Sequence, residues 1–136
     1  LKKVAPVAEK YAITIVIEPL RSEECNLINT FEAGCRLADE VSQPNVKVLV
    51  DYYHMSVEKE PLQHLKDEGR TYLRHVHMAN PTGRVYPRQA GESKYQAFFQ
   101  ILKEIGYTGR ISCEAYSDNF KEDAAAALAL LQNMIG

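Results

Sequence analysis

The 136-residue sequence predicts an α/β fold, with a parallel sheet built from four successive strand–helix units. Each of four short strand-like runs is followed by a segment whose apolar residues have helical spacing. The connections between them are short, and alternation of this kind requires the strands to be parallel. Four such units make a (βα)4 half of a TIM barrel. The four runs are Ile13–Ile17, Val46–Val50, Leu73–Val76 and Arg110–Cys113.

The N-terminal part is predicted to run helix, strand, helix, strand. Apolar residues at helical spacing open the chain, and Pro6 marks where regular helix begins. The β-branched run Ile13–Ile17 predicts a buried strand, and Pro19 should end it because proline has no amide hydrogen for a sheet. An apolar stripe predicts a helix over Glu24–Val41, and a second β-branched run predicts a strand over Val46–Asp51.

The C-terminal part repeats the alternation. Ser56 as N-cap and Gly69 as terminator predict a helix over 57–69, with Pro61 in its early turns. The long segment Asn80–Gly91 is rich in Pro, Gly and Arg, which makes it a candidate functional loop. The remaining expected elements are a strand over Tyr72–Met78, a helix over Glu92–Ile105 closed by Gly106, a strand over Arg110–Glu114, and a helix over 121–135 capped by Asp118.

Composition argues against several classes of function. The 16 basic and 18 acidic residues are mixed along the chain, which gives no basis for nucleic-acid or membrane-surface binding. No apolar run is long enough to span a bilayer, and no signal peptide is visible. The cysteines Cys25, Cys35 and Cys113 are odd in number and lack zinc-site spacing, so we expect buried thiols. We expect a single cytoplasmic domain over residues 1–136.

Charged or imidazole side chains stand at the ends of all four predicted strands: Glu18, Asp51, His77 and Glu114. The carboxyl ends of parallel strands share one edge of a sheet, so these side chains can converge. Three carboxylates and an imidazole suit a hard or borderline divalent cation such as Mn²⁺, Mg²⁺ or Co²⁺. Two alternatives stay open: Asp51 could cap a helix, and His75 has the same side-chain direction as His77.

Several motifs resemble the xylose isomerase-like TIM barrel superfamily. The closest resemblance is to its sugar isomerase and epimerase branch, which includes D-tagatose 3-epimerase and hydroxypyruvate isomerase. It covers nearly the whole chain but only the C-terminal half of such an enzyme. The motifs are Ile17-Glu-Pro-Leu20, Glu24-Cys-Asn26, Ile28-Asn-Thr30, Val50-Asp-Tyr-Tyr-His-Met55, His75-Val-His-Met-Ala79, Gly91-Glu92, Leu102-Lys-Glu-Ile-Gly-Tyr-Thr-Gly109 and Ile111-Ser-Cys-Glu114.

The resemblance implies a divalent-metal-dependent isomerase or epimerase that acts on a ketose or keto acid. Glu18, Asp51, His77 and Glu114 would hold one metal ion, with Zn²⁺ as a further option. Glu18 and Glu114 would also form the acid/base pair that moves a proton between adjacent carbons through a cis-enediolate. The metal would polarise the carbonyl and hydroxyl oxygens of the substrate.

The resemblance also implies three substrate-binding residues, Glu24, His54 and Arg84. Each has a structural alternative: Glu24 could favour the positive end of its helix, and Arg84 could be a solvated loop charge. Relatives often carry Asn-Arg where this chain has Arg21-Ser22, which puts the local substrate contacts or loop geometry in question.

Two alternative functions remain at this point. One is a non-catalytic, metal-binding, self-associating fragment. Four parallel strands leave two edges and an inner face uncovered, so we expect homo-association, as a homodimer or larger assembly, whichever function holds. The other is a zinc phosphodiesterase of the endonuclease IV type. It is disfavoured because no Asp-x-His pair follows His77.

Overall fold

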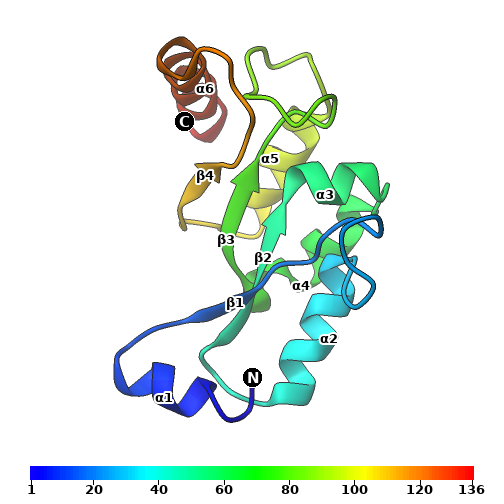
Figure 1. The fold of residues 1–136 in the computed structure, drawn as a ribbon, viewed down its shortest axis with the longest axis vertical. Coiled ribbons are helices and arrows are strands. Elements are labelled where there is room, and N and C mark those ends of the chain that lie inside the picture. Colours follow the sequence, from blue (N-terminus) through cyan, green and yellow to red (C-terminus); the bar gives the residue numbers. More distant parts are fainter.

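The computed structural model describes residues 1–136, and its centre is one parallel sheet with the strand order β1-β2-β3-β4 (Figure 1). Every neighbouring pair is parallel, so each crossover carries helical structure, as the sequence predicts. This is the architecture of half a TIM barrel. The strands are β1 (Ile15–Ile17), β2 (Val46–Asp51), β3 (Leu73–Met78) and β4 (Ile111–Cys113).

Six helices accompany the sheet, and those that lie between β1 and β3 in the chain contact its strands. Helix α2 packs on β2 and on α4, and α4 packs in turn on α5 (Figure 1). The helices are α1 (Ala5–Lys10), α2 (Phe31–Val41), α3 (Tyr52–Val57), α4 (Leu62–Tyr72), α5 (Tyr95–Glu104) and α6 (Phe120–Ile135). None of them is long and apolar enough to cross a membrane.

Alternation along β2 separates the core from the opposite face of the sheet. Val46, Val48 and Val50 lie in the hydrophobic core with helices α2 and α4. Leu49 and Asp51 therefore point to the other face, since successive strand residues alternate. Alternation thus places the strand-end carboxylate on the face away from the helices.

Gly69 allows the close approach of α4 to α5 rather than ending a helix. A Cβ atom at this position would lie 2.7 Å from Ile105 Cδ1. Helix α4 continues past Gly69 to Tyr72, and β3 begins at Leu73. The prediction that Gly69 is a terminator is therefore wrong: the missing side chain serves packing between helices.

The helix predicted over Glu24–Val41 begins only at Phe31. Thr30 is the N-cap, and its side chain accepts a hydrogen bond from the Ala33 amide. The preceding residues form turns tied by Asn29 Nδ2, which donates to the carbonyl oxygens of Leu20 and Cys25. Leu27, expected on the buried stripe, is 80 % exposed.

A short helix, α3, was not predicted, and it displaces the next helix start. Ser56 lies inside α3 rather than capping a helix, and Pro61 is the N-cap of α4. Two further helices begin later than expected. Helix α5 begins at Tyr95 rather than Glu92, and the N-cap of α6 is Asn119 instead of Asp118. Of the thiols expected to be buried, only Cys35 is; Cys25 and Cys113 are half-exposed, and all three are free.

The sheet has two edges without a strand partner, because β1 pairs only with β2 and β4 pairs only with β3. The accessible surface is 8138 Å² for a chain of 15.4 kDa. A folded monomer of that mass exposes about 7,200 Å². The half-barrel therefore shows more surface than a closed domain of its size, in keeping with open edges and an open inner face.

Candidate metal centre

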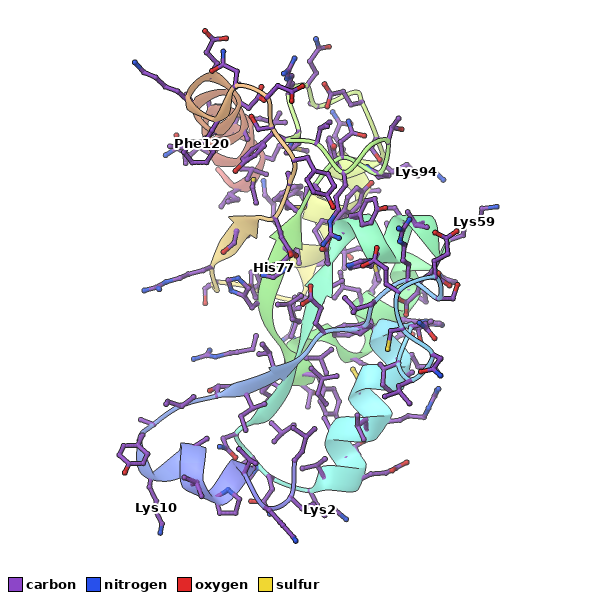
Figure 2. The ribbon with its side chains drawn as sticks, in the orientation of Figure 1. Lys2, Lys10, Lys59, His77, Lys94 and Phe120 are labelled. Carbon is purple, nitrogen blue, oxygen red and sulfur yellow. The ribbon has the colours of Figure 1, made fainter.

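The structure brings together the four strand-end side chains singled out in the sequence: Glu18, Asp51, His77 and Glu114. One potential ligand atom from each lies within 4.8 Å of those from the other three. Parallel pairing explains this, because Asp51 is in register with His77 on the neighbouring strand, and the Glu114 amide donates to the Met78 carbonyl. Figure 2 shows His77 at the sheet, between β2 and β4.

His77 Nδ1 is the centre of the cluster. It lies 3.0 Å from Glu18 Oε1 and 3.2 Å from Glu114 Oε2. The hydrogen bond with His77 lowers the pKa of Glu18, and the same bond raises the pKa of His77. A single ring nitrogen thus faces two carboxylate oxygens, an arrangement in which a cation can replace the shared proton.

Asp51 has one satisfied and one unsatisfied oxygen. Its Oδ1 caps α3 by accepting a hydrogen bond of 2.8 Å from the Tyr53 amide. Its Oδ2 is buried without a hydrogen-bond partner. Burial raises the pKa of this carboxyl. Because an unpartnered buried carboxylate oxygen is costly, an oxygen that faces three other potential ligands fits a divalent cation. Asp51 therefore serves as a helix cap and as a cluster member.

His54 presents an unused donor toward the same space. Its Nδ1 accepts a hydrogen bond of 3.2 Å from the Arg21 amide, which assigns the ring proton to Nε2 when the ring is neutral. Nε2 is buried without a partner, 3.8 Å from Asp51 Oδ2. That distance is too long for a hydrogen bond, so the donor remains free for another acceptor.

The Arg84 side chain extends from the loop after β3 toward the cluster. Its Nη2 lies 3.1 Å from Glu114 Oε2 and 3.8 Å from Asp51 Oδ2. Its side chain is only 16 % exposed. The backbone at Arg84 is in the left-handed region, with φ of 52°, and its carbonyl accepts from the Tyr116 amide. A solvated loop charge, the alternative weighed from the sequence, does not describe this residue.

Glu24 meets Arg84 on the far side of the guanidinium. Its Oε2 lies 3.7 Å from Arg84 Nη1, and its Oε1 accepts from Arg21 Nε at 2.5 Å. Glu24 lies seven positions before α2 starts at Phe31, so a role at that helix N-terminus is ruled out. With every carboxyl ionised and the imidazoles neutral, the carboxylates of Glu18, Glu24, Asp51 and Glu114 and the guanidinium groups of Arg21 and Arg84 carry a formal net charge of −2.

His75 lies on the same face as His77 but outside the cluster. Its Nε2 lies 3.0 Å from Ser112 Oγ, on the neighbouring strand. Burial lowers the pKa of its ring. Because His75 is two residues further from the carboxyl end of β3, its ring lies in the next layer of the sheet. The geometry therefore places His77, and not His75, among the potential ligands.

Sequence reasoning missed the residues that hold the loop between β1 and α2. Glu58 Oε1 accepts hydrogen bonds from the Ser22 amide and hydroxyl, and the buried Glu60 side chain accepts from the Phe31 and Glu32 amides. Both acids follow α3, which itself went unpredicted. No local pattern signals these contacts, because they join segments about 30 residues apart in the sequence.

A parallel half-barrel with three carboxylates and an imidazole gathered at its strand ends is the architecture of a TIM barrel protein with a candidate metal centre. The chain belongs to the family described as xylose isomerase-like TIM barrel, whose model matches residues 1–134. Its similarity to sugar isomerases and epimerases was expected from the motifs, and comparison with known proteins confirms it.

Two curated relatives illustrate the range of that similarity. D-psicose 3-epimerase from Ruminiclostridium cellulolyticum is 30% identical over 116 residues, which cover 85% of this chain and 39% of the relative. Inosose isomerase from Bacillus subtilis is 27% identical over 130 residues, which cover 88% of this chain and 46% of the relative. The chain thus spans less than half the length of these two relatives.

A solved structure shows the same relation in three dimensions. D-psicose 3-epimerase with D-tagatose, from Clostridium cellulolyticum, superposes with a TM-score of 0.88 at 25% identity. The match covers 98% of this chain and 53% of that one. The four-stranded sheet described above therefore corresponds to about half of a complete barrel.

Proposed function

We propose that this chain carries the metal-binding and acid/base half of a ketose or keto-acid isomerase or epimerase. The observation that carries the proposal is the convergence of Glu18, Asp51, His77 and Glu114, with Asp51 Oδ2 buried and unpartnered among them. This donor set suits Mn²⁺, Mg²⁺ or Co²⁺, with Zn²⁺ as a further option. The membership in a family of sugar isomerases and epimerases supports the reaction class.

Glu18 and Glu114 are the proposed proton carriers. They approach His77 from the two opposite edge strands, β1 and β4, so a substrate lying over the imidazole has one carboxylate at each side. One would remove a proton from a carbon next to the carbonyl and the other would return it, by way of a cis-enediolate. A bound divalent ion supplies polarisation of the substrate's carbonyl and hydroxyl oxygens.

Glu24, His54 and Arg84 are the proposed substrate-binding residues. His54 Nε2–H is a buried donor without a partner, which suits a hydroxyl or carbonyl oxygen of a sugar. Arg84 adds donors from the loop after β3, and Glu24 adds an acceptor next to it. Together these groups present both donors and acceptors, as recognition of a polyhydroxylated substrate requires.

Metal analysis of the purified chain tests the site. We expect Mn²⁺ to bind at about one equivalent, and Glu114→Gln to weaken binding at least about tenfold because it removes an anionic ligand. Glu122→Gln, at an exposed position of α6, is the matched control for the loss of one negative charge. Absence of metal from the wild-type chain, or equal binding by both variants, would contradict the proposed centre.

Exchange of substrate protons with solvent tests the chemistry. With Mn²⁺ bound, the chain should catalyse deuterium uptake from D₂O into one or more members of a ketose panel that includes D-tagatose and D-fructose. Glu18→Gln should abolish uptake if it removes a proton carrier. No uptake in the presence of bound metal would favour the alternative, a non-catalytic metal-binding fragment, which the open strand edges and the half-length match support.

A further inference from the structure

We propose that Arg84 is an internal counter-ion of the metal centre, and that a divalent cation must displace its guanidinium from Glu114 on binding. In the structure Arg84 Nη2 lies 3.1 Å from Glu114 Oε2, which is itself 3.2 Å from His77 Nδ1. Arg84 therefore contacts the same Glu114 oxygen that faces the imidazole nitrogen of His77. The inference rests on the proposed metal centre, and it adds a competitor for the same ligand atom.

Two cations cannot share this oxygen without cost. A divalent ion approaches a carboxylate oxygen to about 2.1 Å, which would place it within a few ångströms of a guanidinium that holds its present position. Arg84 is 16 % exposed and Asp51 is fully buried, whereas Glu114 is 53 % exposed, so water screens only part of the repulsion between the two positive charges. Removal of the guanidinium should therefore raise the affinity for metal.

The structure also provides a place for the displaced side chain. Arg84 Nη1 lies 3.7 Å from Glu24 Oε2, and the guanidinium carbon lies 5.0 Å from the centroid of the Tyr53 ring. Neither partner belongs to the ligand set. Both contacts can persist when the ion pair with Glu114 breaks, and cation–π packing retains its strength at a desolvated site. Metal entry would thus leave Arg84 in the site with donors freed for a substrate oxygen.

Arg21 offers a matched control within the same network. Its guanidinium also lies over Tyr53, at 5.5 Å, and it also pairs with Glu24. Its other ion pair is with Glu23, and it reaches none of the four potential ligands. Arg21→Gln and Arg84→Gln therefore remove the same charge from the same aromatic ring, but only the second removes it from a ligand oxygen.

The test is Mn²⁺ titration of the wild-type chain and the two variants by calorimetry, each checked for folding by circular dichroism. We expect Arg84→Gln to bind Mn²⁺ about five- to tenfold more tightly than wild type, and Arg21→Gln to differ by less than about twofold. Equal or weaker binding by Arg84→Gln, or the same gain in both variants, would overturn the counter-ion role while leaving the metal centre intact. If no form binds Mn²⁺, the metal centre and the counter-ion fail together.

A second measurement uses the wild-type protein. It tests whether metal displaces Arg84 from Glu114 even if a variant does not fold. Titration with diamagnetic Mg²⁺ should shift the Arg84 Nε–H resonance in ¹⁵N spectra, in proportion to the fraction of bound metal, because the guanidinium loses its ion pair with Glu114. The Arg21 Nε–H resonance, bonded to Glu24, should move much less. An Arg84 resonance that stays unchanged at saturating Mg²⁺ would overturn the proposal.

Discussion

Asp51 Oδ2 and His54 Nε2 are both buried and lie 3.8 Å apart, and neither atom has a hydrogen-bond partner. The other polar atom of each side chain accepts a hydrogen bond from the backbone. Asp51 Oδ1 accepts from the Tyr53 amide and caps α3, and His54 Nδ1 accepts from the Arg21 amide. Both groups are thus fixed in orientation while one atom of each stays free. Fixed, unpartnered polar groups are what a preorganised binding site requires.

The variant Asp51→Asn distinguishes the role of Asp51 as a helix cap from its proposed role as a metal ligand. The amide oxygen retains the bond to the Tyr53 amide, and asparagine is a good N-cap, so α3 should persist. Loss of a buried charge should leave the metal-free chain as stable as wild type, or more stable by up to about 1 kcal/mol. Mn²⁺ affinity should fall at least about tenfold. Chemical denaturation in EDTA and calorimetric titration measure the two effects; a variant that unfolds in EDTA would show that the charge itself stabilises the fold.

The pair His75 and His77 offers a test of which imidazole binds metal. His77→Gln should weaken Mn²⁺ binding by at least about tenfold, because its ring nitrogen faces two carboxylates. His75→Gln changes the same residue type on the same strand face and should alter binding by less than about twofold. Metal content after dialysis measures both variants, and the reverse order of effects would assign the ligand to His75.

Glu60 should be a main stabiliser of the loop beside the site. Its side chain is 2 % exposed, accepts from the first amides of α2 and lies 2.9 Å from His64 Nδ1. Glu60→Gln should lower the free energy of unfolding by about 1–2 kcal/mol, because a charged acceptor at a helix N-terminus is lost. Glu40→Gln, at an exposed position of α2, should change it by less than about 0.5 kcal/mol. Urea unfolding of the two variants distinguishes them.

Asp123 should make stability depend on pH at the start of α6. Hydrogen bonds from Ser117 and Arg88 lower the pKa of its carboxyl. A carboxyl with a lowered folded-state pKa stabilises the fold fully above its unfolded value, near 4, and loses that contribution as pH falls toward the folded value. The melting temperature of Asp123→Asn should therefore lie below that of wild type at pH 7, with a smaller difference at pH 3. A difference that is constant across this range would contradict the prediction.

Self-association remains a prediction, which the open edges β1 and β4 motivate. A second copy could cover both edges and part of the inner face, burying surface that a closed domain of this mass would hide. Sedimentation velocity over a range of concentrations should show dimers or larger species. A monomer at high concentration would mean that the chain tolerates its open edges alone.

Local patterns sufficed for the alternation of strands and helices and for the choice of strand-end residues. β-Branched runs identified β1 and β2 to within about two residues, because strand preference follows from the residues themselves. Local patterns failed where a tertiary contact outweighs local preference. Residues 24–30 have a helical apolar pattern, yet Asn29 holds them in turns by bonds to backbone carbonyls. Gly69 has the character of a terminator, yet α4 continues through it to pack against Ile105.

By itself, the sequence determined the parallel half-barrel and placed Glu18, Asp51, Glu114 and a histidine of β3 near its strand ends, because the alternation of strands and helices predicts a parallel sheet with one shared carboxyl edge. Only the tertiary structure selected His77 over His75. It also decided how the potential ligands are partnered. It left Asp51 Oδ2 and His54 Nε2 without hydrogen bonds and set Arg84 against Glu114. These relations join residues from different strands and loops. They depend on register and loop path, which no local pattern encodes.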